Sequence, residues 1–270
     1  PIYYLLLLGW RLLVGEGAYV LRFPSALFSL LTVVVIYRLG RALDGSATGL
    51  LAALLLTLSR FAVGWAQEIR MYSLAALWST GALAAALLWW RRPDARSWWA
   101  YVATTTGSLL TLYLTAPVPL VANLGFAVVW WRRERPRRLF TRWLAAQIAV
   151  LAVVLPWLAY ALPRMHSWES DSSFSARAFI ELYTVMLTVG SPLDLERYLP
   201  WAVAVVGVMI VGLMAVWRRR RSSAQTGGLV MLLAGLLLPA IFVYVVSLPT
   251  FGFIYARPLV PRYLLPLSAC

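Results

Sequence analysis

The chain has 270 residues, of which 62% are hydrophobic and only 13% are charged, whereas about 25% of the residues of an average soluble domain are charged. This composition excludes a single soluble domain and predicts an all-α protein that crosses a membrane several times. The formal net charge is +14, because 24 arginines are set against 10 acidic residues; the chain has no lysine. The only cysteine, Cys270, excludes an internal disulfide framework and a paired-cysteine metal site.

Apolar segments long enough to cross a bilayer follow one another along the chain. A transmembrane helix needs about 20 apolar residues, with a range of about 17–25. We therefore predict one transmembrane domain, residues 1–270, built as a helical bundle of about eight spans at residues 23–39, 47–64, 71–90, 98–113, 115–131, 143–161, 200–217 and 227–248.

Two further segments are expected to lie outside the membrane core. Residues 1–14 are apolar, but at about 1.5 Å per residue they are too short for a core of about 30 Å. We interpret residues 1–22 as an external segment that contains an interfacial helix; the alternative is the tail of a truncated span. Residues 162–199, the longest polar stretch, are predicted to form an external loop whose apolar part packs back on the membrane.

The arginines test the topology that eight spans imply. Fifteen of the 24 fall in one set of alternating loops, against three acidic residues, and the other set holds nine arginines and seven acidic residues. Because cytoplasmic loops carry an excess of Lys and Arg, the first set is predicted to be cytoplasmic. Residues 1–22, 60–70, 162–199 and 249–262 are then external. Arginines at the ends of spans also account for the basic charge better than nucleic-acid binding does.

One polar stretch, Gln67–Tyr72, interrupts the apolar sequence on the predicted external side. Charged groups near a membrane core cost free energy and are functional candidates by default. Glu68 and Arg70 lie two residues apart here, and arginine presents a planar fork of donors that suits phosphate. A plain solvated turn is the alternative. Candidate phosphate- or substrate-binding residues on this side are Arg22, Glu68, Arg70, Tyr72, Arg262 and Tyr263.

The motifs of soluble enzymes do not occur in the chain. We find no glycine-rich phosphate loop, no His/Cys metal cluster and no serine nucleophile elbow. We therefore expect no metal site, and no catalytic residue can be assigned from these patterns. The one histidine, His166, is interpreted as a solvated loop residue.

Several short motifs, in this order and spacing, resemble glycosyltransferase family 39. They are Arg22-Phe23-Pro24-Ser25-Ala26-Leu27-Phe28, Tyr37-Arg38-Leu39-Gly40-Arg41 and Gln67-Glu68-Ile69-Arg70-Met71-Tyr72. Pro1-Ile2-Tyr3-Tyr4 is similar to the end of the family's His/Lys-Pro-Pro-x-Tyr-Tyr segment, and Pro261-Arg262-Tyr263 to its later Pro-Arg-Tyr segment. The family contains protein O-mannosyltransferase-like and aminoarabinose-transferase-like membrane enzymes with the GT-C fold. In one departure, Tyr113-Leu114-Thr115 lacks the histidine that many members have after this span.

The resemblance implies a GT-C-type transmembrane bundle in a plasma or inner membrane. It implies that a sugar passes from a polyprenyl-phosphate donor to a protein, lipid or glycan acceptor on the external face, with inversion. The family's acidic general base lies in a first external loop, which we expect upstream of Pro1 in a longer chain. Because the sequence begins within a pattern at Pro1 and stops at Cys270 just after an apolar run has begun, we expect both ends to be truncated. Glu68 and Arg70 match the second external loop, where they would shape the donor-phosphate site.

Two other functions remain open at this point. A flippase or other transporter of lipid-linked sugars would need polar residues near the bilayer midplane, whereas the polar residues here lie at the ends of the spans. A non-catalytic membrane subunit would leave the external Glu and Arg residues without a role.

Overall fold

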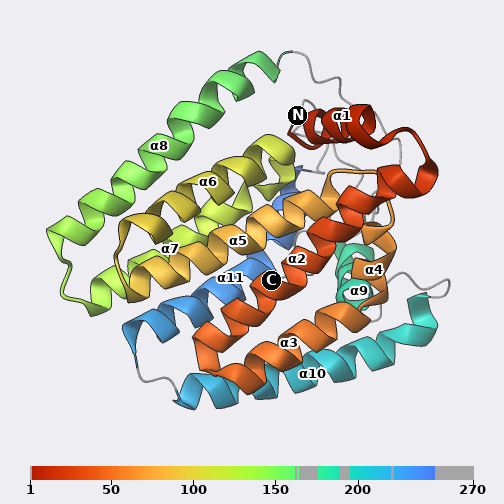
Figure 1. Ribbon diagram of the computed structural model, residues 1–270. Helices are drawn as coiled ribbons and strands as arrows, with labels where there is room; N and C mark the ends of the chain where they lie inside the picture. The colour runs from red at the N-terminus through yellow and green to blue at the C-terminus, as the bar shows by residue number, and fades with distance from the viewer. Residues whose placement is uncertain (1, 162, 164–175, 189–194, 220–221, 247–270) are drawn as a thin grey trace.

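The computed structural model describes residues 2–161, 163, 176–188, 195–219 and 222–246, and its regular structure there is entirely helical. Figure 1 shows the helices in chain order. They are α1 (Ile2–Val14), α2 (Ala18–Asp44), α3 (Ser46–Leu58), α4 (Arg60–Ala66), α5 (Tyr72–Arg91), α6 (Ala95–Thr111), the 3-10 helix η1 (Tyr113–Thr115), α7 (Pro117–Arg132), α8 (Arg137–Ala161), α9 (Ala176–Thr188), α10 (Leu195–Arg219) and α11 (Ser223–Val246).

The all-α membrane bundle predicted from the sequence is confirmed. Within the described residues, five helices are long and apolar enough to cross a membrane, or six if the bent pair α3 and α4 counts as one span. The other two expected spans also coincide with helices. However, α6 has only 17 residues. In α10 the part from Arg197 to Gly212 is apolar, but this part is shorter than a membrane span.

The expected span 47–64 is not one straight helix. The chain bends by 63° between α3 and α4, because Ser59 leaves the helical conformation and caps α4 with its side chain, which accepts a hydrogen bond from the Ala62 amide at 3.3 Å. Residues 60–66, expected in an external loop, are therefore helical. The polar loop that remains is residues 67–71, and α5 starts directly after it.

Helix α5 lies at the centre of the bundle. Most of its residues are buried, and α2, α6, α7 and α11 pack around it. Near its end, Trp89 and Trp90 join an aromatic cluster with Tyr101, Phe126 and Trp143. The Trp143 ring stacks on the Phe126 ring with centroids 4.5 Å apart. This cluster fixes the bundle near the end opposite the polar loop.

Two glycine contacts bring helix backbones close together. A Cβ atom on Gly49 of α3 would lie 2.5 Å from the Tyr37 carbonyl oxygen of α2. A Cβ atom on Gly227 of α11 would lie 2.8 Å from the Gly125 carbonyl oxygen of α7. Small residues at such crossings let membrane helices pack tightly without a hydrophobic driving force between them.

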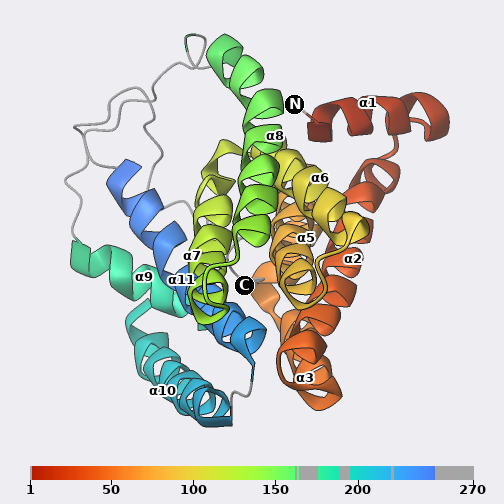
Figure 2. The same cartoon turned by 90° about the vertical axis from the view of Figure 1, so that its left-hand side faces the viewer.

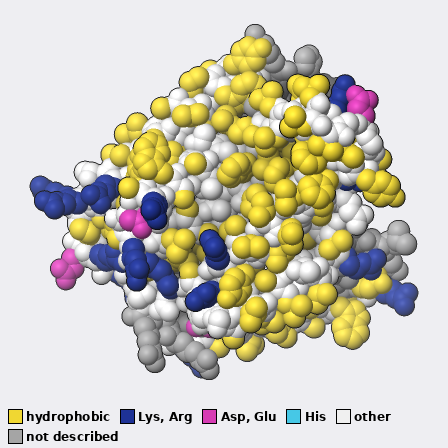
Figure 3. Space-filling view, in the orientation of Figure 1, with side chains coloured by type: hydrophobic (Ala, Val, Ile, Leu, Met, Phe, Trp, Pro, Cys, Tyr) yellow, Lys and Arg dark blue, Asp and Glu magenta, His cyan; other side chains and the backbone are white. Residues whose placement is uncertain are grey.

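The basic turns all lie at one end of the bundle. The α2–α3, α5–α6 and α7–α8 connections, together with the end of α10 and the start of α11, lie at the lower left of Figure 1. Figure 3 shows Arg side chains gathered there, with a mainly hydrophobic face beside them. The opposite end holds α1, α4 and the loop 67–71. The alternation that the arginines predicted is thus reproduced in space, whereas the side of the membrane each end faces stays a prediction.

Helix α1 lies across the end of the bundle rather than along it, as Figure 2 shows. Its Trp10 stacks on Phe23 of α2, with ring centroids 5.6 Å apart, and donates a hydrogen bond to the Val20 carbonyl at 2.8 Å. Residues 18–22, expected to belong to the external segment, instead form the first turn of α2. Of the expected loop 162–199, residues 176–188 form α9 and residues 195–199 begin α10; the remainder, except 163, lies outside the described residues.

Candidate functional site

The loop 67–71 presents one acidic and one basic side chain at the end of the bundle. Nε of Arg70 lies 3.9 Å from Oε2 of Glu68, and the two side chains are 48% and 52% exposed. Such a long, half-exposed ion pair contributes little to stability. At 3.9 Å the contact is too long for a hydrogen bond, so it places the guanidinium beside a carboxylate without fixing it there.

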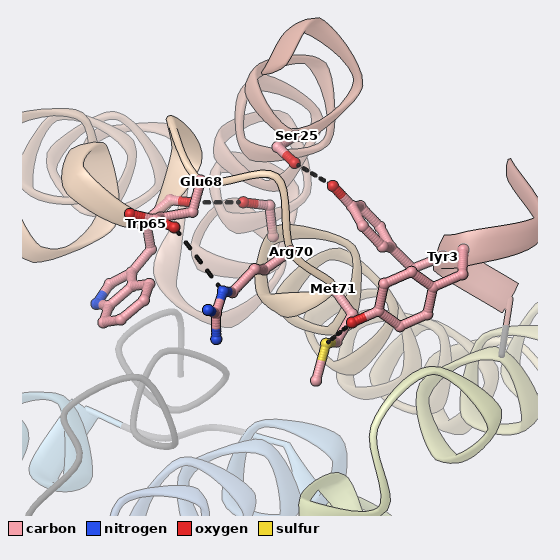
Figure 4. A network of polar contacts seen from close by, with 8 residues as sticks. Tyr3, Ser25, Trp65, Glu68, Arg70 and Met71 are labelled. Atoms are coloured by element: carbon pink, nitrogen blue, oxygen red, sulfur yellow. Dashed lines mark hydrogen bonds and ion pairs between the residues drawn. The ribbon is translucent and has the colours of Figure 1, made fainter. Parts of the chain in front are cut away.

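Figure 4 shows how the Arg70 side chain lies. The Nε edge faces Glu68, and the two terminal nitrogens point away from it. Within the described residues, Glu68 is the only ion-pair partner of Arg70. The terminal pair is the part of an arginine fork that binds phosphate or carboxylate in a bidentate way.

Buried aromatic side chains support the loop from below. Tyr72, the first residue of α5, is only 2% exposed and lies in a cluster with Phe61, Leu112 and Met186. Its ring meets the Trp65 ring edge-on, with centroids 5.3 Å apart. The Ser73 hydroxyl donates to the Trp65 carbonyl at 3.3 Å and ties the two ends of the loop together. Tyr72 thus lies under the loop rather than at its surface.

Helix α1 reaches the loop through two tyrosines. The hydroxyl of the buried Tyr3 is 3.0 Å from the hydroxyl of Ser25 in α2, and the neighbouring Tyr4 hydroxyl donates to Sδ of Met71 at 3.6 Å. Burial raises the pKa of the Tyr3 phenol, with the Ser25 hydrogen bond opposing the shift. Tyr3 is therefore neutral at physiological pH. Figure 4 shows α1, α2 and the loop linked in this way.

The other predicted site residues are placed as follows. Arg22 is exposed on the first turns of α2, one turn before Ser25, so the Tyr3 contact connects its helix to the loop. Arg262 and Tyr263 lie outside the described residues. The structure thus brings together Glu68, Arg70 and Tyr72, and links the helix of Arg22 to them through α1.

Sequence reasoning missed two supports of the loop. Tyr3 was interpreted only as part of an interfacial helix, although its neighbour Tyr4 and the Pro-x-Tyr-Tyr resemblance marked the segment. Met186 of α9 packs on the same cluster as Tyr72. The sequence predicts that the apolar part of residues 162–199 packs back on the membrane, which stays a prediction; in the structure α9 packs against α11 and this cluster.

Comparison with known proteins identifies the family of the chain. The family model described as dolichyl-phosphate-mannose-protein mannosyltransferase matches residues 1–160. The crystal structure of ArnT from Cupriavidus metallidurans in the apo state is similar over 100% of this chain and 47% of the ArnT chain, with a TM-score of 0.63 and 19% sequence identity. The chain thus spans about half the length of ArnT. No curated protein matches the chain.

At 19% identity the likeness to ArnT shows the fold alone, and the fold is the GT-C type that the sequence motifs indicated. The family match covers more than half of the chain and includes α1, α2 and the loop 67–71. The chain therefore belongs to the dolichyl-phosphate-mannose-protein mannosyltransferase family and has its GT-C-type transmembrane helical fold.

Proposed function

We propose that the chain is part of a membrane glycosyltransferase that uses a polyprenyl-phosphate sugar as donor. The sugar would pass to an acceptor on the external face, with inversion at its anomeric carbon. The description of the family supports this class of donor, because it names a mannosyl lipid phosphate. The hydrophobic faces of the bundle suit the polyprenyl chain, which lies in the membrane core, whereas the phosphate needs a polar site at the membrane surface.

The observation that carries the proposal is the position of Arg70. Its side chain is half exposed, its Nε edge faces Glu68 while its terminal nitrogens point away, and the loop lies at the end of the bundle away from the basic turns. A lipid phosphate at this depth would meet a preoriented, always-charged donor fork. We propose that Arg22, Arg262 and Tyr263 complete this site and that Tyr72 positions the loop from below.

The proposed reaction needs the arginines of the phosphate site in the step that breaks the bond between sugar and phosphate. The acceptor oxygen attacks the anomeric carbon, the bond from that carbon to the phosphate oxygen breaks, and the lipid phosphate leaves with the electron pair. The phosphate gains negative charge in the transition state, and a preorganised arginine stabilises that charge. The proton of the acceptor goes to a base that we assign to none of the described residues.

Binding of free polyprenyl phosphate, the leaving product, tests the phosphate site without knowledge of the sugar or the acceptor. We expect Arg70→Ala to weaken binding roughly 10- to 100-fold, the range for losing charge-assisted hydrogen bonds. Arg70→Lys keeps the charge but loses the fork, so its effect should be smaller. Arg177→Ala is the matched control, because Arg177 is also exposed and paired with a glutamate, Glu181, at 2.8 Å. Equal binding by the Arg70→Ala and Arg177→Ala proteins would refute the site.

Sugar transfer separates the enzyme from the flippase and the non-catalytic subunit. In the full-length protein, Arg70→Ala and Glu68→Gln are expected to abolish transfer from polyprenyl-phosphate mannose, while membrane insertion stays intact. The readout is incorporation of labelled mannose by membranes that contain equal amounts of each variant. Normal transfer by both variants would refute the proposed roles. Movement of the lipid-linked sugar across vesicles without any transfer would favour a flippase.

A further inference from the structure

The first turns of α8 carry an unbalanced group of arginines at the basic end of the bundle. Arg137, Arg138 and Arg142 are exposed, and no acidic residue lies in the first turn of the helix. The sequence had placed these residues in a loop, whereas the structure places them on a helix that continues to Ala161. At the start of α6, by contrast, the Asp94 carboxylate caps the helix by accepting a hydrogen bond from the Ser97 amide at 2.7 Å.

Neighbouring arginines have partners, whereas these three have none in the part of the chain that the structure describes. Arg132 donates to the Thr226 hydroxyl and Arg133 to the Ser223 hydroxyl, both at 3.2 Å. Arg135 stacks over the Trp131 ring at 3.7 Å. Within the described residues, the side chains of Arg137, Arg138 and Arg142 form no ion pair or hydrogen bond. Glu134, the one acidic residue of the α7–α8 connection, is exposed and forms no ion pair there either.

An apolar stripe continues directly from these arginines along α8. Residues three or four apart lie on the same face of a helix. On one face of α8, Arg137 is followed at this spacing by four apolar side chains that are 43% to 59% exposed: Phe140, Leu144, Ile148 and Leu151. Helix α8 packs against α6 on its other side and lies at the edge of the bundle, as Figures 1 and 2 show. Arg138 and Arg142 are four residues apart and lie together on the neighbouring side of the same turns. The exposed surface of α8 therefore has a basic beginning, with Arg137 in line with a long apolar stripe and the other two arginines beside it.

We propose that this surface binds an anionic phospholipid of the leaflet that meets the basic end. The phosphate would lie against Arg137, Arg138 and Arg142, and an acyl chain would run along the stripe from Phe140 to Leu151. Charge complementarity selects the class of lipid, because a headgroup with net negative charge neutralises cations that have no ion-pair or hydrogen-bond partner among the described residues. The surface is at the opposite end from Glu68 and Arg70, so the inference is independent of the proposed donor site.

Lipid binding to the purified full chain in detergent tests the proposal. Native mass spectrometry would count bound lipid with phosphatidylglycerol, with phosphatidylcholine of the same acyl chains, and with inorganic phosphate as competitor. We expect tight binding of phosphatidylglycerol only. The triple variant Arg137→Gln/Arg138→Gln/Arg142→Gln should weaken it about 100-fold, from roughly fivefold for each arginine near a lipid surface. The single variant Arg137→Gln should weaken phosphatidylglycerol binding about fivefold. This variant tests the proposal if the triple variant does not fold.

The matched control removes three exposed arginines at the opposite end, Arg11, Arg60 and Arg177. This Arg→Gln triple variant has the same net charge as the first and should keep the affinity for phosphatidylglycerol. Equal loss in both triple variants would show a general charge effect and overturn the proposal. Equal binding of phosphatidylcholine, displacement by millimolar inorganic phosphate, or unchanged binding by the Arg137→Gln protein would overturn it as well.

Discussion

At the scale of single residues, the hydrogen bond between Tyr3 and Ser25 couples α1 to the bundle. Both side chains are buried, at 1% and 0% exposed, and their hydroxyl oxygens are 3.0 Å apart. A buried hydroxyl that loses its partner costs about 1–3 kcal/mol, whereas removing both partners together can be nearly neutral. The pair is therefore expected to behave as a unit.

A double-mutant cycle on this pair is our prediction at the residue scale. Tyr3→Phe and Ser25→Ala should each lower the stability of the protein in detergent by about 1–3 kcal/mol. The double variant should lose clearly less than the sum of the two, which thermal unfolding would measure. Tyr4→Phe is the control, because Tyr4 is exposed and its hydroxyl donates a long hydrogen bond, of 3.6 Å, to the Met71 sulfur. Strict additivity would mean that the two hydroxyls contribute separately.

The sequence alone singles out Glu68 and Arg70 as candidates, because charged residues inside an apolar pattern are conspicuous and costly; their role in a site stays a prediction. It was insufficient for Tyr3, whose partner is 22 residues away on another helix. Nothing in a one-dimensional pattern shows which hydroxyl a buried tyrosine will meet. Tyr72 illustrates the same limit, because its position beside the charged pair gave no sign that its ring packs beneath the loop.

At the scale of helices, apolar length predicted where the helices lie but not where they end. Helix α2 extends from residue 18 to 44 instead of 23 to 39, because backbone hydrogen bonding continues past the membrane core into polar ends. The break at Ser59 was hidden within an apolar run. A serine can cap a helix with its side chain or lie in the helix interior, and tertiary packing decides between the two.

Close helix crossing gives the prediction at this scale. Gly227→Ala places a methyl group 2.4 Å from Cγ2 of Val129 and 2.8 Å from the Gly125 carbonyl oxygen. The carbonyl is backbone and cannot rotate away, so α7 and α11 must separate. We expect a loss of about 1–3 kcal/mol, the usual cost of overpacking, in unfolding experiments in detergent. Gly207→Ala in α10 is the control, because its methyl group meets nothing within 4 Å and alanine is the better helix former. Equal stability of the two variants would contradict tight packing at Gly227.

At the scale of the whole molecule, a one-dimensional arginine count anticipated a three-dimensional arrangement. The connections that carry most of the arginines come together at one end although they are far apart in sequence. Counting arginines was sufficient because successive spans place successive loops at opposite ends of the bundle. This sorting of the loops does not depend on how the helices pack. It could not show that Arg132 and Arg133 tie α7 to α11. Those contacts depend on which helices are neighbours.

The arrangement makes a direct prediction about sidedness. In a Cys270→Ser background, Glu16→Cys lies in the turn between α1 and α2, and Arg96→Cys lies near the start of α6 at the basic end; both sites are exposed. A membrane-impermeant thiol reagent should label Glu16→Cys in intact cells and Arg96→Cys only after permeabilisation, because basic connections stay on the cytoplasmic side. The Glu16 substitution breaks only an exposed ion pair with Arg11, which costs at most about 1 kcal/mol. The opposite labelling pattern would place the Glu68–Arg70 loop in the cytoplasm, and the proposed transfer on the external face would then be wrong.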